Sequence, residues 1–135
     1  MSHTPLERVF VYGTLKRGFC NHALLAHARF VDTAVTVERF GLYLGPDVYA
    51  PGQVDIPFLY RIAEPLEDAV SVHGEVWAVD AATLKRLDHL EGHPDWYRRE
   101  TILVTTATEE LMNVQAYLIP GKPSTDLQPI TTGCY

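Results

Sequence analysis

The sequence has few cysteines, no long apolar run and no excess of positive charge. Its two cysteines, Cys20 and Cys134, lie near opposite ends of the 135 residues and form no CxxC motif. Two such thiols make neither a disulfide framework nor a metal-binding spacing, so we expect a reducing, cytoplasmic location. No apolar run approaches the roughly 20 residues that span a bilayer. The N-terminus also lacks the basic and then apolar segments of a signal peptide, so we expect no membrane partner.

The charge balance argues against nucleic acid as a partner. The chain has 11 Lys and Arg against 17 Asp and Glu, a net charge of −6, and its basic residues are scattered. Binding to a phosphate backbone depends on clustered basic side chains. With 47% hydrophobic and 21% charged residues, the composition is that of a folded globular protein. The length predicts a single domain over residues 1–135, which we expect to be a monomer.

Strand patterns outnumber helix patterns along the chain. Two helices are predicted, one over 22–29 capped by Asn21 and one over 80–90 capped by Asp80 and ended by Gly92 and Pro94. Loops are expected over 45–57 and 63–71, and the tail from about residue 121 is expected to pack loosely. Runs of β-branched and aromatic residues predict strands over 8–12, 30–44 (one bent strand or two), 57–62, 73–79, 97–107 and 114–120. This order favours an α+β fold with a largely antiparallel sheet, open or closed into a barrel.

A turn with two glycines, Tyr12-Gly13-Thr14-Leu15-Lys16-Arg17-Gly18, directly follows the first predicted strand. Glycine permits a positive φ and lets a ligand approach bare N–H groups, and successive N–H groups can form an anion-binding nest. The spacing matches neither the P-loop nor GxGxxG. The turn is therefore either a ligand-binding loop or a plain exit from the strand.

Glu91 stands at the end of the second predicted helix. Leu84, Leu87 and Glu91 are spaced i, i+3 and i+7, so the face that buries the leucines also directs Glu91 inward. Burial and the negative end of the helix dipole both raise the pKa expected of this carboxyl group. A carboxyl group tuned in this way suits a general base near neutral pH. The alternative is a solvated carboxylate at a frayed helix end, or one paired with Arg98 or Arg99.

Other chemistries find little support in the residues. His89 and His93 are four apart, but Gly92 breaks the helix that would align them, so no metal site is predicted. There is no GxSxG motif for a serine hydrolase. Cys20, beside His22, is better explained as a loop thiol than as a nucleophile.

Taken together, the motifs resemble a known family. They are VFVYGTLKRG (9–18) with Asn21-His22, DIPF (55–58), GEVWAVD (74–80) and LKRLDHLEGHPDWYRR (84–99). In this order, over about residues 8–120, they resemble the γ-glutamylcyclotransferase-like superfamily. Within it, the long YGTLKRG match followed by Asn21-His22, and the IP-aromatic element, are most similar to the γ-glutamylamine cyclotransferase branch.

The resemblance implies a fold, a reaction and a site. The fold would be a small mixed, largely antiparallel β-barrel flanked by two or so helices. The enzyme would convert a γ-glutamyl amine or γ-glutamyl amino acid, its small-molecule partner, into 5-oxoproline and a free amine without metal or cofactor. The implied site residues are Glu91 as catalytic base and then acid, Tyr12, Gly13, Thr14 and Leu15 around the glutamyl head, and Tyr97 on the pocket wall.

Two questions stay open at the level of sequence. The same fold could instead hold a non-catalytic domain that binds a small molecule, because fold does not fix function. The identity of the leaving amine and the group held by the N–H atoms of residues 13–15, either the substrate α-carboxylate or an oxyanion, are likewise undetermined.

Overall fold

A computed structural model describes residues 6–19, 21–46, 55–61, 69–123 and 127–135. Cys20, most of the predicted loop 45–57 and most of the predicted loop 63–71 lie outside these ranges.

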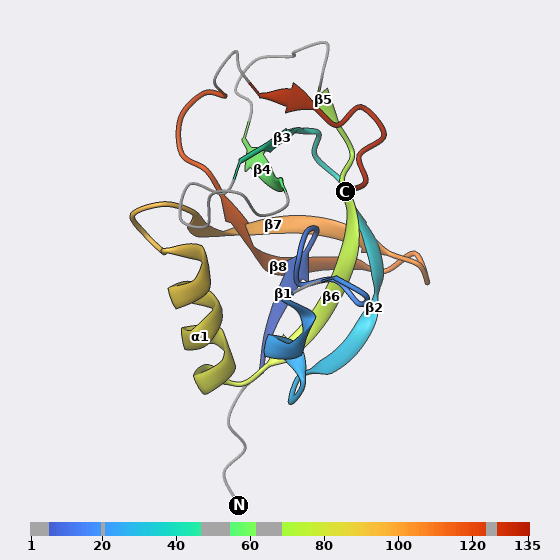
Figure 1. Ribbon diagram of the computed structural model, residues 1–135. Coiled ribbons are helices and arrows are strands. Elements are labelled where there is room, and N and C mark those ends of the chain that lie inside the picture. Colours follow the sequence, from blue (N-terminus) through green and yellow to red (C-terminus); the bar gives the residue numbers. More distant parts are fainter. Residues whose placement is uncertain (1–5, 20, 47–54, 62–68, 124–126) are drawn as a thin grey trace, which may run out of the picture.

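Five strands close into a barrel in the order β1-β6-β2-β7-β8 (Figure 1). Neighbouring strands are antiparallel except β1 and β8, which pair in parallel at Val9 and Gln115. The barrel is therefore mixed and largely antiparallel, and this prediction is confirmed. The strands are β1 (Glu7–Val11), β2 (Arg29–Thr36), β6 (His73–Val79), β7 (Arg98–Thr106) and β8 (Leu111–Leu118).

A second, smaller sheet lies across one end of the barrel (Figure 1). Here β3 pairs with β4, β5 and β9, so the predicted run 30–44 is two strands rather than one. β5 falls within the segment predicted as loop, which corrects that expectation for its last residues. The strands are β3 (Phe40–Gly45), β4 (Ile56–Tyr60), β5 (Ala69–Val70) and β9 (Gln128–Pro129).

The end of the chain packs more firmly than its sequence suggested. β9 adds to the edge of β3, and the Ile130 amide donates to the Leu42 carbonyl at 2.8 Å. Farther on, the His73 amide donates to the Gly133 carbonyl at 2.8 Å. The expectation of a loose tail is therefore corrected for residues 127–135. The contacts were not predicted because they are main-chain hydrogen bonds, which require no alternating pattern of apolar and polar side chains.

The longer helix follows its prediction closely. α1 (Ala81–Glu91) begins where the Asp80 carboxylate accepts from the Thr83 amide at 2.8 Å, and it ends at Gly92 with φ of 66°. A left-handed residue at this position is typical of glycine. Within the described residues, no helix is both long and apolar enough to cross a membrane.

The shorter helix differs from its prediction. Residues 22–29 were expected to be helical, but only the 3₁₀ turn η1 (His22–Leu25) forms. Asn21 precedes it without a side-chain cap, and its side-chain amide donates to the Thr14 hydroxyl at 2.8 Å. The turn starts where predicted but ends early, because β2 begins at Arg29 and pairs there with β6.

Two hydrophobic clusters hold these elements together. One fills the barrel and includes Phe10, Phe40 and Val104. The other lies beneath α1 and η1 and includes Leu25, Leu87 and Tyr97. The second cluster fixes the helix to the barrel and so determines where the end of α1 lies.

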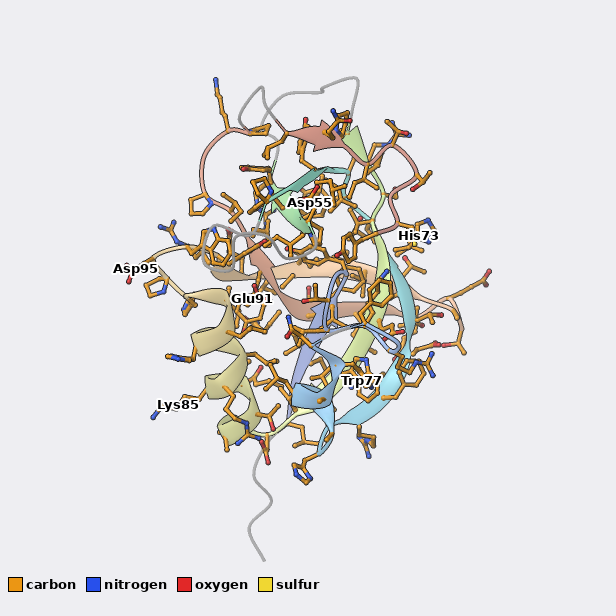
Figure 2. The ribbon with its side chains drawn as sticks, in the orientation of Figure 1. Asp55, His73, Trp77, Lys85, Glu91 and Asp95 are labelled. Atoms are coloured by element: carbon orange, nitrogen blue, oxygen red, sulfur yellow. The ribbon has the colours of Figure 1, made fainter. Side chains whose placement is uncertain are left out.

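Replacing Leu87 by alanine should lower the free energy of unfolding by about 2–5 kcal/mol. The Leu87 side chain is fully buried, so its removal leaves a cavity between α1 and the barrel. Urea unfolding followed by circular dichroism measures the loss. The control is Lys85→Ala on the exposed face of the same helix (Figure 2), which should change stability by no more than about 0.5 kcal/mol. Equal effects of the two changes would contradict the placement of α1.

Candidate active site

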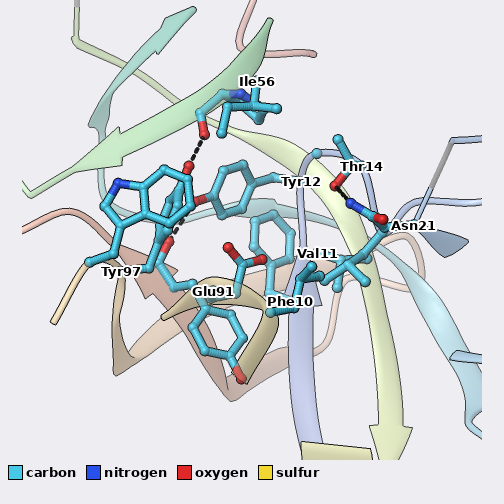
Figure 3. A pocket seen from close by; sticks show the side chains of 14 residues that line it. Phe10, Val11, Tyr12, Thr14, Asn21, Ile56, Glu91 and Tyr97 are labelled. Atoms are coloured by element: carbon cyan, nitrogen blue, oxygen red, sulfur yellow. Dashed lines mark hydrogen bonds between the residues drawn. The ribbon is translucent and has the colours of Figure 1, made fainter. Parts of the chain in front are cut away.

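One pocket brings together all six residues predicted for the site. It lies where the end of β1, the start of β4 and the end of α1 meet (Figure 3). The predicted residues that line it are Tyr12, Gly13, Thr14, Leu15, Glu91 and Tyr97. These residues are up to 85 positions apart in the sequence, so only the fold makes them neighbours.

Glu91 reaches the pocket as the last residue of α1. Leu87, one turn earlier on the same face, is buried against the barrel. After Gly92 the chain turns back, so that the Tyr97 amide donates to the Glu91 carbonyl at 3.1 Å. Figure 3 shows the side chain of the half-buried Glu91 pointing into the pocket, toward the rings of Phe10 and Tyr12. The helix end and its turn therefore hold the carboxylate at the pocket wall.

The turn after β1 forms the opposite wall. The Lys16 amide donates to the Gly13 carbonyl at 3.1 Å, and the Asn21 amide donates to the Thr14 carbonyl at 2.9 Å. A positive φ occurs at Gly18 (86°) but not at Gly13, so the expected positive φ is observed at one of the two glycines of the turn. At Gly13 the space for a side chain is taken by β4, because a Cβ there would lie 2.6 Å from Cγ of Pro57.

Two buried tyrosines hold the walls of the pocket in place. The Tyr97 hydroxyl donates to the Pro57 carbonyl at 2.7 Å, and the Tyr12 hydroxyl donates to the Tyr117 carbonyl. Burial, together with the nearby Tyr97 and Glu91, raises the pKa of Tyr12 well above its ordinary value. The Tyr12 hydroxyl therefore stays protonated at neutral pH and remains a donor.

Sequence reasoning missed part of the pocket lining. Tyr117 is the clearest case, because its hydroxyl donates to Asp88 at 2.7 Å. Burial of the side chain is the main cause that raises the pKa of Tyr117, and the hydrogen bond to Asp88 raises it further. The sequence did carry a signal, since Ala116, Tyr117, Leu118 and Ile119 form an unbroken apolar run at the end of a strand that otherwise alternates. The lining residues not predicted are Phe10, Val11, Asn21, Ile56, Pro57, Leu90, Trp96 and Tyr117.

The end of the chain bridges the rim of the pocket. The Lys16 ammonium, one residue after the lining residue Leu15, donates to the Tyr135 main-chain oxygen at 2.6 Å. The Tyr135 hydroxyl donates to the Asp55 carbonyl at 2.8 Å, one residue before Ile56. The tail thus connects the turn after β1 with the start of β4.

The pocket is suited to proton transfer beside a fixed turn. Among the described residues that line it, Glu91 alone has a charged side chain. Arg99, one of the two arginines named above as alternative partners of Glu91, forms an ion pair with Asp88. Nη1 of Arg99 lies 3.0 Å from Oδ2 of Asp88. Within the described part of the chain, no three His, Cys, Asp or Glu side chains are grouped as metal ligands.

This chain is similar to known proteins in both sequence and structure. The model of the family described as "Gamma-glutamyl cyclotransferase, AIG2-like" matches residues 9–135. A Methanocaldococcus jannaschii protein named "Putative gamma-glutamylcyclotransferase" is 34% identical over 116 residues, 85% of this chain and 86% of that protein. A Rattus norvegicus protein named gamma-glutamylaminecyclotransferase is 36% identical over 104 residues, 73% of this chain and 64% of that protein. The crystal structure of an AIG2-like protein from Mus musculus superposes with a TM-score of 0.72 at 31% identity, covering 88% of this chain and 80% of that one.

Proposed function

The chain belongs to the γ-glutamyl cyclotransferase, AIG2-like family, and from this we propose that it releases 5-oxoproline and a free amine from γ-glutamyl amines. The observation that supports this most directly is the position of Glu91. Its carboxylate lies in one pocket with the turn of residues 12–15, as the single charged side chain among the described lining residues.

The proposed reaction is an intramolecular acyl transfer. Glu91 takes a proton from the substrate α-ammonium, and the free amine attacks the δ-carbonyl carbon of the same glutamyl group. The new C–N bond closes a five-membered ring and leaves a tetrahedral oxyanion. As the oxyanion collapses, the original amide C–N bond breaks and protonated Glu91 returns its proton to the departing amine. The ring nitrogen still carries two hydrogens and passes one of them to that amine through Glu91, so the products are 5-oxoproline and an ammonium ion. The pocket favours ring closure by holding a flexible chain in the shape of the ring.

The turn after β1 supplies the second proposed contact. Gly13, Thr14 and Leu15 line the pocket, and we propose that their N–H groups face the substrate. They would hold either the substrate α-carboxylate or the developing oxyanion, since backbone N–H groups stabilise both. Tyr12 and Tyr97 contribute shape, because their hydroxyls donate to protein carbonyls.

The charge of the pocket supports an amine as the leaving group. In a γ-glutamyl α-amino acid, a second carboxylate stands next to the bond that breaks, close to Glu91. No Lys, Arg or His belongs to the described residues that line the pocket, so that carboxylate would meet repulsion with no compensating cation. In γ-glutamyl-ε-lysine the alkyl chain carries the carboxylate several bonds away.

We expect γ-glutamyl-ε-lysine to be cleaved with a kcat/KM at least about tenfold higher than γ-glutamyl-alanine or glutathione, equivalent to about 1.4 kcal/mol of discrimination. Release of 5-oxoproline from each compound, measured by chromatography, gives the comparison. Turnover of γ-glutamyl-alanine alone would keep the reaction and overturn the choice of amine. The absence of turnover on all three would favour a domain that binds a small molecule without catalysis, which a thermal shift with 5-oxoproline detects.

A further inference from the structure

Asp88 lies one helical turn before Glu91 and joins α1 to two strands of the barrel. Nη1 of Arg99, from β7, lies 3.0 Å from each oxygen of the Asp88 carboxylate. The Tyr117 hydroxyl, from β8, donates to Oδ1 of Asp88 at 2.7 Å. We call these three side chains the Asp88 tether. A carboxylate held by one cation and one hydroxyl is fixed in direction as well as in position.

Main-chain contacts extend the tether around the end of the helix. The Asp88 carbonyl accepts from the His93 amide at 2.9 Å, and the Arg99 amide donates to Nδ1 of His93 at 3.0 Å. The Tyr97 amide donates to the Glu91 carbonyl. The segment from Asp88 to Arg99 is therefore a closed loop of hydrogen bonds that contains Glu91.

The tether also reaches the far wall of the pocket. Tyr117, whose side chain binds Asp88, accepts the Tyr12 hydroxyl at its main-chain carbonyl. Tyr12 directly precedes the turn proposed to hold the glutamyl head, and both tyrosines line the pocket. Asp88 thus connects the helix that presents Glu91 with the strand pair that presents the turn.

We infer that Asp88 is a positioning residue, which holds the end of α1 so that the Glu91 carboxylate meets the substrate α-amine. The inference rests on the proposed function of Glu91. Asp88 itself does not belong to the pocket lining and acts through the helix end. Its effect on the rate follows from geometry, since a displacement of about 1 Å in a reacting group costs up to about 100-fold.

The test compares Asp88→Ala and Asp88→Asn with the matched control Asp95→Asn. Asp95 is an exposed carboxylate in the same turn after α1 (Figure 2). We expect Asp88→Ala to lower kcat by about 10- to 100-fold while KM changes by no more than about twofold. Asp88→Asn should retain part of the activity, because its amide oxygen still accepts from the Tyr117 hydroxyl. Asp95→Asn should stay within about twofold of the unmodified protein.

Hydrogen exchange provides a readout that does not depend on turnover. The amides of Gly92 and His93 donate to carbonyls in the last turn of α1. In Asp88→Ala they should exchange at least about tenfold faster, while amides of β8 stay protected. A residue that served only global stability would speed exchange across the whole domain and would leave kcat of the folded protein unchanged.

The outcomes separate this inference from the proposed function. If the unmodified protein cleaves its substrate and folded Asp88→Ala keeps its kcat, the inference is overturned and the function stands. If the unmodified protein cleaves no γ-glutamyl compound, the proposed function falls, and unchanged exchange at Gly92 and His93 would overturn the tether as well. If Asp88→Ala does not fold, Asp88→Asn decides: a lowered kcat in folded protein supports the inference, and an unchanged kcat overturns it.

Discussion

Replacing Glu91 by glutamine should lower 5-oxoproline release by about 100- to 10,000-fold, the usual contribution of a general acid–base group. The amide has nearly the shape of the carboxylate but accepts no proton from the substrate ammonium at neutral pH. Because Glu91 is half-buried at the end of α1, the change should leave the fold intact. Initial rates with γ-glutamyl-ε-lysine, together with a circular dichroism melt, measure both effects.

The same chemical change at an exposed site provides the control. Glu110→Gln, in the turn between β7 and β8, alters an exposed carboxylate that does not line the pocket and should keep full activity. Binding of 5-oxoproline to Glu91→Gln, followed by thermal shift, shows whether the pocket persists. Turnover in Glu91→Gln within about tenfold of the unmodified enzyme would exclude Glu91 as the base.

Replacing Gly13 by alanine should give the second largest effect, a fall in kcat/KM of about 100-fold. The added methyl group would lie 2.6 Å from Cγ of Pro57, so either the turn or the start of β4 must move. Both border the pocket, so the N–H groups of residues 13–15, which are proposed to bind the substrate, would shift or lose their place beside β4. The overpacking itself should cost about 1–3 kcal/mol of stability. Steady-state kinetics and urea unfolding measure the two losses separately.

Gly18 offers a matched substitution in the same turn. A Cβ there meets nothing within 4 Å, although φ is 86°. Gly18→Ala should therefore cost about 1 kcal/mol through backbone strain and leave kcat/KM within about twofold. A loss of activity in Gly18→Ala equal to that in Gly13→Ala would mean that stability of the turn, rather than its contact with Pro57, controls the rate.

Local patterns predicted the elements whose stabilising contacts are themselves local. β6 was predicted at its observed bounds because its residues alternate along one strand. α1 was predicted with its cap at Asp80 and its end at Gly92, since both contacts lie within one turn of the helix. η1 was predicted too long because β2 already begins at Arg29 and pairs with β6, a contact that no spacing within residues 22–29 reports.

In the site, too, local features were predicted and long-range contacts were not. Helical spacing sufficed to predict that Glu91 shares a face with Leu87, and the glycine-rich turn stood out as a motif. The close packing at Gly13 was not predicted, because the group that a side chain there would meet belongs to Pro57, more than forty residues away. Tyr117 and the Asp88 tether were missed for the same reason, since their partners come from different strands.

The sequence by itself determined the family, the barrel class and the two segments that meet at the pocket, because motifs and periodicity depend on neighbours along the chain. Only the tertiary structure decided how those segments face each other, which tyrosines complete the walls and how the tail joins the rim. Those features depend on contacts such as Tyr97 with Pro57 and Tyr135 with Asp55. Such contacts form between residues 40 and 80 positions apart, where the packing of β4 and of the tail, rather than local preference, brings the two partners together.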